Sequence, residues 1–430
     1  MQRGMLAATG VAAMVAIVLG AGLGSLEGQP LLLGIRAEFL LFALTLLGVA
    51  LFHERTLEVA LTGLTAIVAL KFLSGGGFDF GGHLLHEAPI LINLFGLLLG
   101  FGVLARHFEQ SEIPELLPAW LPDSWWGGFV LLCLVFVMSS FLDNIAAAMI
   151  GGTVALHVYK GRLDIGFIAA IVAASNAGGA GSVVGDTTTT MMWIAGVGWT
   201  EVLHAYIAAV PALLVFGIIA ARQQHAYQPI QADPTPGHAV QWSRVVAVAM
   251  ILAGAILTNV LLDFPAAGVW AAIVLAAIFT KTDWKVVPAS LKGSLFLIAL
   301  VTCASLMPVE TLPSPSWVSA LGLGFVSAVF DNIPLTKLAI DQGGYDWGML
   351  AYAVGFGGSM MWFGSSAGVA ISNILPQAKS VGQWLRRGWH VALGYVIGFF
   401  VLLAVLGWNP HAIGEKSAAT PAPDVEQAAP

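Results

Sequence analysis

Charged residues are scarce in this chain. Only 10% of its 430 residues are Asp, Glu, Lys or Arg, whereas soluble domains carry about 25%. Hydrophobic residues make up 58% of the sequence, and the mean hydropathy is +0.86. This composition excludes a protein that buries one core in water, and it indicates an integral membrane protein.

Cysteine and clustered basic residues are also rare. The two cysteines, Cys133 and Cys303, both lie in apolar runs. We therefore expect small buried side chains and neither a disulfide framework nor a cysteine metal site. No stretch is rich in Lys and Arg, which argues against a nucleic-acid partner.

Long apolar runs predict membrane-spanning helices, each of which needs about 20 residues. The expected spans are 5–24, 37–52, 57–73, 89–106, 202–221, 244–262, 266–281, 291–307 and 388–407. Segment 107–126 contains prolines, acidic residues and tryptophans, so we expect it to lie at the membrane interface. We expect the first span to be a retained anchor, with a cleaved signal peptide as the alternative.

Four other apolar stretches are interrupted by polar or glycine-rich residues. They are 125–158, 164–198, 316–343 and 346–375. In lipid, such interruptions occur only inside protein or beside water-filled cavities. We expect the first and third to be re-entrant hairpins and the other two to be broken helices that cross. Only Leu335 to Gln342 remain after the third stretch turns, too few to cross a membrane.

Basic residues predict the orientation. With the hairpins and broken helices placed in this way, 13 of the 17 Lys and Arg residues fall on one face, which is then cytoplasmic. The thirteen are Arg3, Arg55, Arg106, Lys160, Arg162, Arg222, Arg244, Lys281, Lys285, Lys292, Lys379, Arg386 and Arg387. Arg36, Lys71 and Lys416 fall on the other face, and Lys337 stays within the membrane. The sequence thus predicts about 11 transmembrane helices in the plasma (inner) membrane, with a cytoplasmic N-terminus and an external C-terminus.

The order of these stretches indicates two inverted repeats. We expect an N-terminal helix in 1–30, a first repeat in 31–221, a cytoplasmic linker in 222–243, a second repeat in 244–408 and a disordered external tail in 409–430. Inverted repeats place their substrate near the membrane midplane, between half-helices.

Two pairs of motifs support the duplication. "SSFLDNIAAAM" places Asp143 and Asn144 within an apolar run, and "SAVFDNIPLTK" does the same with Asp331 and Asn332. Each is followed by a glycine-rich break, "GGAGSVVGDTTTT" and then "GGSMMWFGSSAGV". In the alignment of these breaks, Asp186 matches Ser365. A carboxylate within the membrane is costly, so we interpret these positions as functional.

The residue types in the motifs predict a hard-cation site. Asp and Asn favour turns and helix N-termini, and glycines let a broken helix expose its carbonyl groups. Carboxylate, amide and hydroxyl oxygens are ligands for Na⁺ or a similar hard cation. The expected cation- and proton-binding residues are Asp143, Asn144, Asp186, Thr187, Asp331, Asn332, Ser365 and Ser366, with Asp143, Asn144, Asp331 and Asn332 as Na⁺ ligands. The expected break glycines are Gly178, Gly179, Gly185, Gly357, Gly358 and Gly364.

Structural roles are the alternative for several of these residues. Asp143 and Asp331 could only cap buried helices, and Asp186 could only cap the half-helix that begins with "TTTT". We expect residues 188–190 to hydrogen-bond back to their own helix. Lys337 follows Asp331 by six residues, which is not one face of a regular helix. It is a candidate charge partner that offsets the charge of the site or stands in for a cation.

The motifs resemble those of the ion transporter (citrate transporter-like) superfamily, and within it the NhaD-type sodium/proton antiporters. The similarity runs from about residue 30 to 408 and is most specific in "FLDNIAAAM", "GDTTTTMMWIAG", "FDNIPLTKLA" and "GSSAGVAISN". It implies two inverted repeats with re-entrant hairpins and broken helices, and a homodimer with a separate scaffold region. The dicarboxylate branch carries Ser-Asn-Thr at its hairpin tips. Here Asp143 and Asp331 replace the serines, and Ile145 and Ile333 the threonines, which favours a cation over an anion.

We therefore expect a secondary transporter that exchanges Na⁺, or Li⁺, for H⁺. Its partners would be lipid and the transported cation, and it would be no enzyme and need no cofactor. The alternative is transport of an anion, such as citrate, another dicarboxylate or arsenite, by the same fold. An intramembrane aspartyl protease is disfavoured, because Val183 stands where its Gly-x-Gly-Asp signature needs the first glycine.

Overall fold

The computed structural model describes residues 31–32, 35–74, 77–231 and 239–413. The regular structure in this part is helical, apart from one pair of two-residue antiparallel strands, β1 (Leu31–Leu32) and β2 (Ile35–Arg36). In this pair, Leu31 lies opposite Arg36 and Leu32 opposite Ile35. The helix expected in 5–24 and the end of the expected tail lie outside the described residues.

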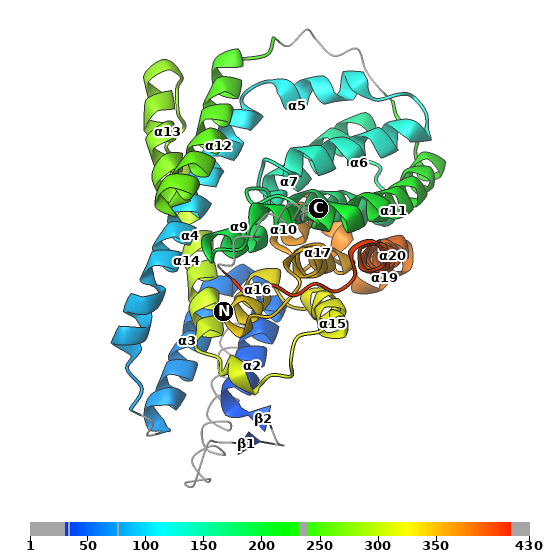
Figure 1. Cartoon of the computed structure of the whole chain (residues 1–430). Helices are drawn as coiled ribbons and strands as arrows, with labels where there is room; N and C mark the ends of the chain where they lie inside the picture. Colours follow the sequence, from blue (N-terminus) through cyan, green and yellow to red (C-terminus); the bar gives the residue numbers. More distant parts are fainter. Residues whose placement is uncertain (1–30, 33–34, 75–76, 232–238, 414–430) are drawn as a thin grey trace, which may run out of the picture.

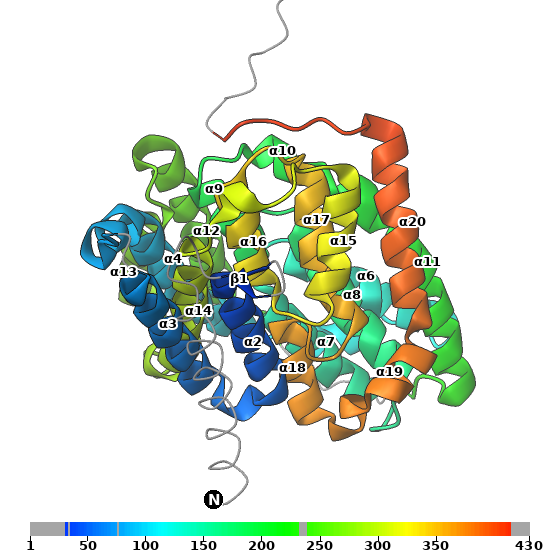
Figure 2. The same cartoon turned by 90° about the horizontal axis from the view of Figure 1, so that it is seen from below.

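One group of helices forms a layer along one side of the molecule (Figures 1 and 2). This scaffold layer consists of α2 (Ala37–Leu51), α3 (Thr56–Leu73), α4 (Phe80–Glu109), α12 (Trp242–Leu262), α13 (Pro265–Phe279) and α14 (Val286–Ser305). Within it, α14 packs against α3 and α4, while α12 and α13 pack against each other and against α4.

The second group of helices forms a bundle beside the scaffold layer (Figure 2). The bundle consists of α6 (Trp125–Ser139), α7 (Asn144–Val158), α8 (Ile165–Ala180), α11 (Ala205–Tyr227), α15 (Trp317–Ser327), α17 (Trp347–Gly357), α18 (Ser366–Ile374), α19 (Val381–Arg387) and α20 (Trp389–Leu406). Two short helices touch both groups. They are α9 (Thr187–Ile194), which contacts α4 and α17, and α16 (Asn332–Gln342), which contacts α14 and α17.

Short helical segments connect the longer helices. They are α5 (Ile113–Leu116), α10 (Trp199–Leu203), η1 (His53–Arg55), η2 (Leu117–Trp120), η3 (Val309–Thr311), η4 (Gly358–Met360) and η5 (Pro376–Lys379). Two of them, α5 and η2, form the segment that the sequence predicts to lie at the membrane interface. Neither is long enough to cross a membrane.

Six helical segments in the described part are long and apolar enough to cross a membrane. They are Thr56–Leu73, Phe80–Glu109, Trp199–Tyr227, Trp242–Leu262, Val286–Ser305 and Trp389–Leu406. The prediction of an all-α polytopic membrane protein is confirmed. The number of crossings, their orientation and the inversion of the repeats stay predictions.

One helix is much longer than the sequence predicts. The apolar run indicates a span over 89–106, but α4 has 30 residues and begins at Phe80, where Asp79 accepts a hydrogen bond from the Gly82 nitrogen. The added N-terminal turns carry Glu87, which lies outside the apolar run, and Pro89 lies inside the helix. Prolines are tolerated in membrane helices because neighbouring groups satisfy the freed carbonyls.

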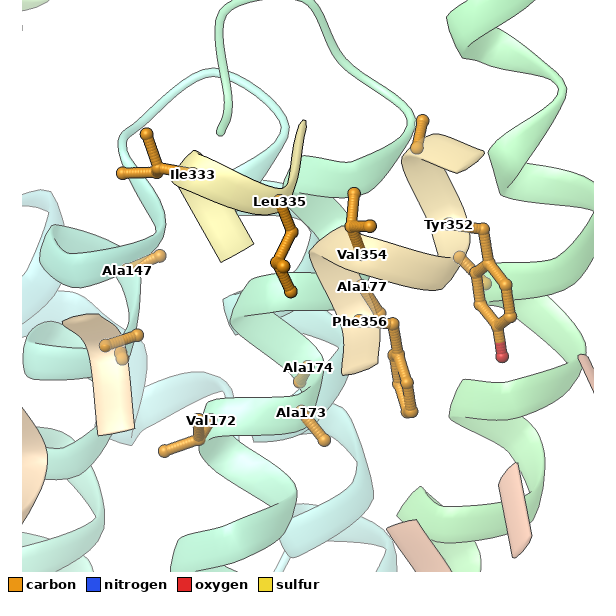
Figure 3. Close-up of a cluster of buried hydrophobic side chains, with 14 of the residues drawn as sticks. Ala147, Val172, Ala173, Ala174, Ala177, Ile333, Leu335, Tyr352, Val354 and Phe356 are labelled. Carbon is orange, nitrogen blue, oxygen red and sulfur yellow. The ribbon is translucent and has the colours of Figure 1, made fainter. Parts of the chain in front are cut away.

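The core of the bundle surrounds α8, whose residues are all buried. Figure 3 shows its small side chains beside apolar side chains of α16 and α17. The residues are Val172, Ala173, Ala174 and Ala177 of α8, Leu335 of α16, and Val354 and Phe356 of α17. Alanines let helices approach closely in a membrane, so α8 can hold short helices from both halves of the chain in place.

Candidate functional site

Both Asp-Asn pairs lie at a turn between two helices, as the sequence pattern predicts. Asp143 is the N-cap of α7, where its carboxylate accepts a hydrogen bond from the Ile145 nitrogen at 3.2 Å. Asp331 is the N-cap of α16 and accepts from the Ile333 nitrogen at 3.0 Å. Each aspartate therefore caps the helix that follows it.

Both glycine-rich stretches break a helix in the same way. In the first half, α8 ends at Ala180 and α9 begins after its N-cap, Asp186. In the second half, α17 ends at Gly357 and α18 begins after its N-cap, Ser365. The predicted pairing of Asp186 with Ser365 is thus matched by equivalent capping positions.

The helix end before each break packs tightly against the first arm of its own hairpin. A Cβ atom on Gly178 would collide with the Phe136 carbonyl, and one on Gly357 would collide with the Gly324 carbonyl. Phe136 and Gly324 each lie seven residues before their hairpin aspartate. The two glycines thus allow the same backbone approach in both halves.

The tips and breaks meet at one cavity of about 570 Å³. Seven of the eight predicted binding residues line it. They are Asp143, Asn144, Asp186, Thr187, Asp331, Asn332 and Ser366. The eighth, Ser365, is buried behind the wall. The scaffold helices α2, α3, α4 and α14 provide the opposite wall.

The charge at this cavity favours a cation. The carboxylates of Asp143 and Asp331 both lie near enough to repel the carboxylate of Asp186. None of the three forms an ion pair with a described Lys, Arg or His side chain. A concave site with unbalanced negative charge attracts cations and excludes anions.

The first hairpin tip and the second break form one half of the site, in which the polar groups hydrogen-bond to one another. The Asn144 side-chain nitrogen donates to the Asn176 oxygen at 3.1 Å. The Asn176 nitrogen donates to the hydroxyls of Ser359 at 2.9 Å and Ser365 at 3.0 Å. Sequence reasoning missed Asn176. The signal for it was an asparagine inside the apolar helix "IVAASNAGGA", two residues before the break.

The second hairpin tip and the first break form the other half of the site, in which buried polar atoms lack hydrogen-bond partners. Among the described residues, Asp186 Oδ2, Thr188 Oγ1 and Asn332 Nδ2 are buried without a hydrogen bond. Asp186, Thr188 and Asn332 are 2%, 0% and 3% exposed. Buried polar groups are normally satisfied, so this group calls for a ligand.

The threonines that follow Asp186 have two different roles. The hydroxyls of Thr189 and Thr190 donate to the Asp186 carbonyl at 2.9 and 2.8 Å, so they bond back to their own helix as predicted. The same prediction for Thr188 is wrong, because its hydroxyl has no hydrogen-bond partner among the described residues. Thr188 lies two residues after Asp186, and its backbone nitrogen donates to Asp186 Oδ1 at 3.1 Å.

Lys337 lies apart from this site. Its ammonium nitrogen is 2.8 Å from Glu87 Oε2 and 2.7 Å from Asp341 Oδ1. No ion pair between Lys337 and Asp331 occurs in the described part of the chain. The structure thus gives Lys337 two acidic partners that the sequence spacing did not indicate.

The donor set of the cavity is that of a hard-cation site. Within the described ranges, no group of three or more His, Cys, Asp or Glu side chains is arranged to hold a metal ion. The available donors are carboxylate, amide and hydroxyl oxygens, the ligand type that Na⁺ and other hard cations take.

Comparison with known proteins supports the class of membrane transporters. No family model matches the chain. The chain is 26% identical over 381 residues to a protein of Vibrio parahaemolyticus described as Na⁺/H⁺ antiporter NhaD, covering 73% of this chain and 89% of that protein. It is 26% identical to the NhaD antiporter of Halomonas elongata, covering 69% of this chain and 72% of that protein.

A similar protein also occurs in a plant. Sodium/proton antiporter 1 of Arabidopsis thaliana is 25% identical, covering 65% of this chain and 55% of that protein. The resemblance to the NhaD-type sodium/proton antiporters that the motifs indicate is therefore confirmed.

Proposed function

We propose that this protein is a secondary transporter that exchanges Na⁺ or Li⁺ for H⁺. The similar proteins are named as sodium/proton antiporters, and the cavity combines the carboxylates of Asp143, Asp186 and Asp331 with neutral oxygen donors. A transporter of this kind is no enzyme, and its ions are cargo rather than cofactors.

The observation that carries this proposal is that buried polar atoms of Asp186, Thr188 and Asn332 lack hydrogen-bond partners. A dehydrated Na⁺ beside Asp186 Oδ2 would take the Thr188 hydroxyl as a second ligand. It would take the Asn332 oxygen as a third once that amide is rotated, since oxygen and nitrogen of an amide are exchanged by a simple flip. Asp143 and Asp331 supply the remaining negative charge.

Exchange follows if the two ions compete for the same carboxylate. A carboxylate that holds a proton binds Na⁺ weakly, and one that holds Na⁺ releases its proton. Asn144 and Asn332 provide neutral oxygens and do not titrate. Binding one ion then expels the other, so antiport needs no separate proton path.

Transport in inside-out vesicles with a pH-sensitive dye tests the proposal. We expect the fluorescence of the dye to recover on addition of Na⁺ or Li⁺. We also expect an apparent Na⁺ affinity that weakens as the pH falls. A response only to citrate or arsenite would instead support the anion transporter. A Na⁺ affinity independent of pH would contradict competition at a carboxylate.

Neutral variants at the hairpin tips test the aspartates. We expect Asp143→Asn and Asp331→Asn both to lose exchange while keeping normal expression, because the amide preserves the helix cap but removes the charge. Full activity in both variants would show that these aspartates do not carry the coupling.

Orientation and assembly are also proposals. We propose an inner-membrane protein with a cytoplasmic N-terminus and an external C-terminus. Single cysteines at Gly161 and Thr311, in a chain without Cys133 and Cys303, should be labelled from the cytoplasmic and external sides respectively. A homodimer is proposed from the family resemblance, and the mass of the detergent-solubilised protein tests it.

A further inference from the structure

A buried ion cluster lies outside the cation site. Lys337 is only 2% exposed, and its ammonium group contacts carboxylate oxygens of Glu87 at 2.8 Å and Asp341 at 2.7 Å. None of these three residues is among those that line the cavity. Lys337 is therefore a buried cation whose role is not explained by the walls of the cation site.

The cluster connects the scaffold layer to the second hairpin. Glu87 belongs to α4, whereas Lys337 and Asp341 lie one turn apart on α16. Asp331, which caps α16, precedes Lys337 by six residues, about 9 Å along the helix. The Lys337–Glu87 pair thus holds a helix that begins at the cation site against a helix of the scaffold layer.

The cluster also lies beyond the end of the cavity that is nearer the start of α4. The cavity follows α4 from Leu98 to Glu109. Glu87 lies 11 residues before Leu98, about 16 Å along the helix. At this end of α4, the His83 ring nitrogen hydrogen-bonds the Ser305 hydroxyl of α14 at 3.0 Å. The basic-residue bias assigns this end to the external face, so the cavity extends toward the cytoplasmic one.

The buried Lys337–Glu87 ion pair stabilises the conformation in which α16 lies beside α4. Removing one partner of a buried ion pair leaves the other charge buried and uncompensated, which strongly favours conformations that hydrate it. On the scaffold side α16 packs against α14, and the contact between Lys337 and Glu87 exists only while α16 keeps this position beside α4. Any conformation that opens a path from the external face between these helices must break it.

We propose that Lys337 is a positioning residue that pins the second hairpin to α4 and closes the external side of the cation site. The inference rests on the proposed function, since it assumes that the site opens to the two faces in turn. Without the pin, the external path opens more often and the cytoplasmic cavity is open less often.

Thiol labelling measures this opening without any transported ion. The reporter is Leu91→Cys in a chain with Cys133→Ser and Cys303→Ser. Leu91 is 7% exposed and lies one helical turn from Glu87 on α4. With an impermeant reagent outside, we expect Lys337→Met to increase the labelling rate at position 91 by about tenfold or more. Glu87→Gln should act in the same direction, and Lys337→Arg should keep labelling slow.

A second reporter and a matched control complete the test. Ala105→Cys lies in the cavity wall, and its labelling from the cytoplasmic side should fall in Lys337→Met. Lys292→Met is the control, because its ion pair with Glu58 is exposed and joins two scaffold helices. It should change neither rate.

The outcome separates this proposal from the proposed function. Unchanged labelling at position 91 in both Lys337→Met and Glu87→Gln, in folded protein, would contradict the proposal that Lys337 closes the external side. So would equally faster labelling in the Lys292→Met control. Faster labelling specific to the Lys337 and Glu87 variants would support the pin, even if the dye assay showed a different transported ion.

Discussion

The two halves of the site have the same backbone plan but opposite polar chemistry. Asn176 of α8 donates hydrogen bonds to Ser359 and Ser365, which lie in the second break. The equivalent residue of α17 is Gly355, and a Cβ there would lie 3.1 Å from Ala180 and 3.4 Å from Asp186 Oδ2. One half is therefore closed by its own hydrogen bonds, and the other has an unpaired carboxylate beside a residue without a side chain.

This difference separates a hydrogen-bonded part of the site from an unpaired one. The Asn176 half joins the first hairpin to the second break by hydrogen bonds. The Asp186 half leaves polar atoms unpaired, and it is the half in which we propose that the ion binds. The predictions below either remove this difference or test it from both sides.

The largest effect is expected at Asp186. Asp186→Asn removes a charged ligand, and we expect the apparent Na⁺ affinity to fall by about a hundredfold or exchange to disappear, since interactions with charged groups contribute about 1.5–3 kcal/mol. Ser365→Ala changes the equivalent position in the other half and should reduce affinity far less. Sodium-dependent dye responses compare the two, and equal losses would contradict this difference.

Adding a side chain at the breaks should harm both halves alike. A Cβ at Gly185 would collide with the Ser139 carbonyl, and one at Gly364 would lie 2.5 Å from the Ala328 carbonyl. We expect Gly185→Val and Gly364→Val both to lower the thermal stability and transport sharply, as overpacking costs about 1–3 kcal/mol or more. Normal melting temperature and transport in both would refute the shared backbone plan.

Making the two halves alike should weaken binding more moderately. Gly355→Asn places an amide beside Asp186 Oδ2, where it can donate a hydrogen bond and compete with the cation. We expect the apparent Na⁺ affinity to fall about tenfold, the effect of one hydrogen bond to a charged group. Gly355→Ala is the control for bulk alone, and an equal loss there would mean that crowding rather than polarity is responsible.

The smallest expected effect separates two adjacent threonines. Thr188→Val removes an unpartnered hydroxyl, so we expect a few-fold lower Na⁺ affinity and little change in melting temperature. Thr189→Val removes hydrogen bonds to the Ser182 and Asp186 carbonyls. It should lower stability by about 1 kcal/mol and change affinity less. The reverse pattern would contradict the role assigned to Thr188.

The shared backbone plan could be predicted from the sequence because it depends on local chemistry. An aspartate caps the helix that follows it, and a glycine marks where a backbone approaches closely. Both turns and both breaks can therefore be predicted from the sequence. The difference between the halves cannot, because it depends on which distant groups meet. The hydrogen bonds from Asn176 cross 183 and 189 residues of chain. Glu87, the partner of Lys337 on the scaffold layer, likewise lies in the first turns of α4, which the apolar pattern does not predict.

The size of the cavity has a consequence for dehydration. A volume of about 570 Å³ has room for on the order of twenty water molecules at the density of the liquid. In the proposed mechanism, a sodium ion that enters this cavity stays hydrated until it reaches the hairpin tips. The free-energy cost of stripping its hydration shell is then confined to the proposed contact with Asp186, and selectivity among ions of the same charge arises there.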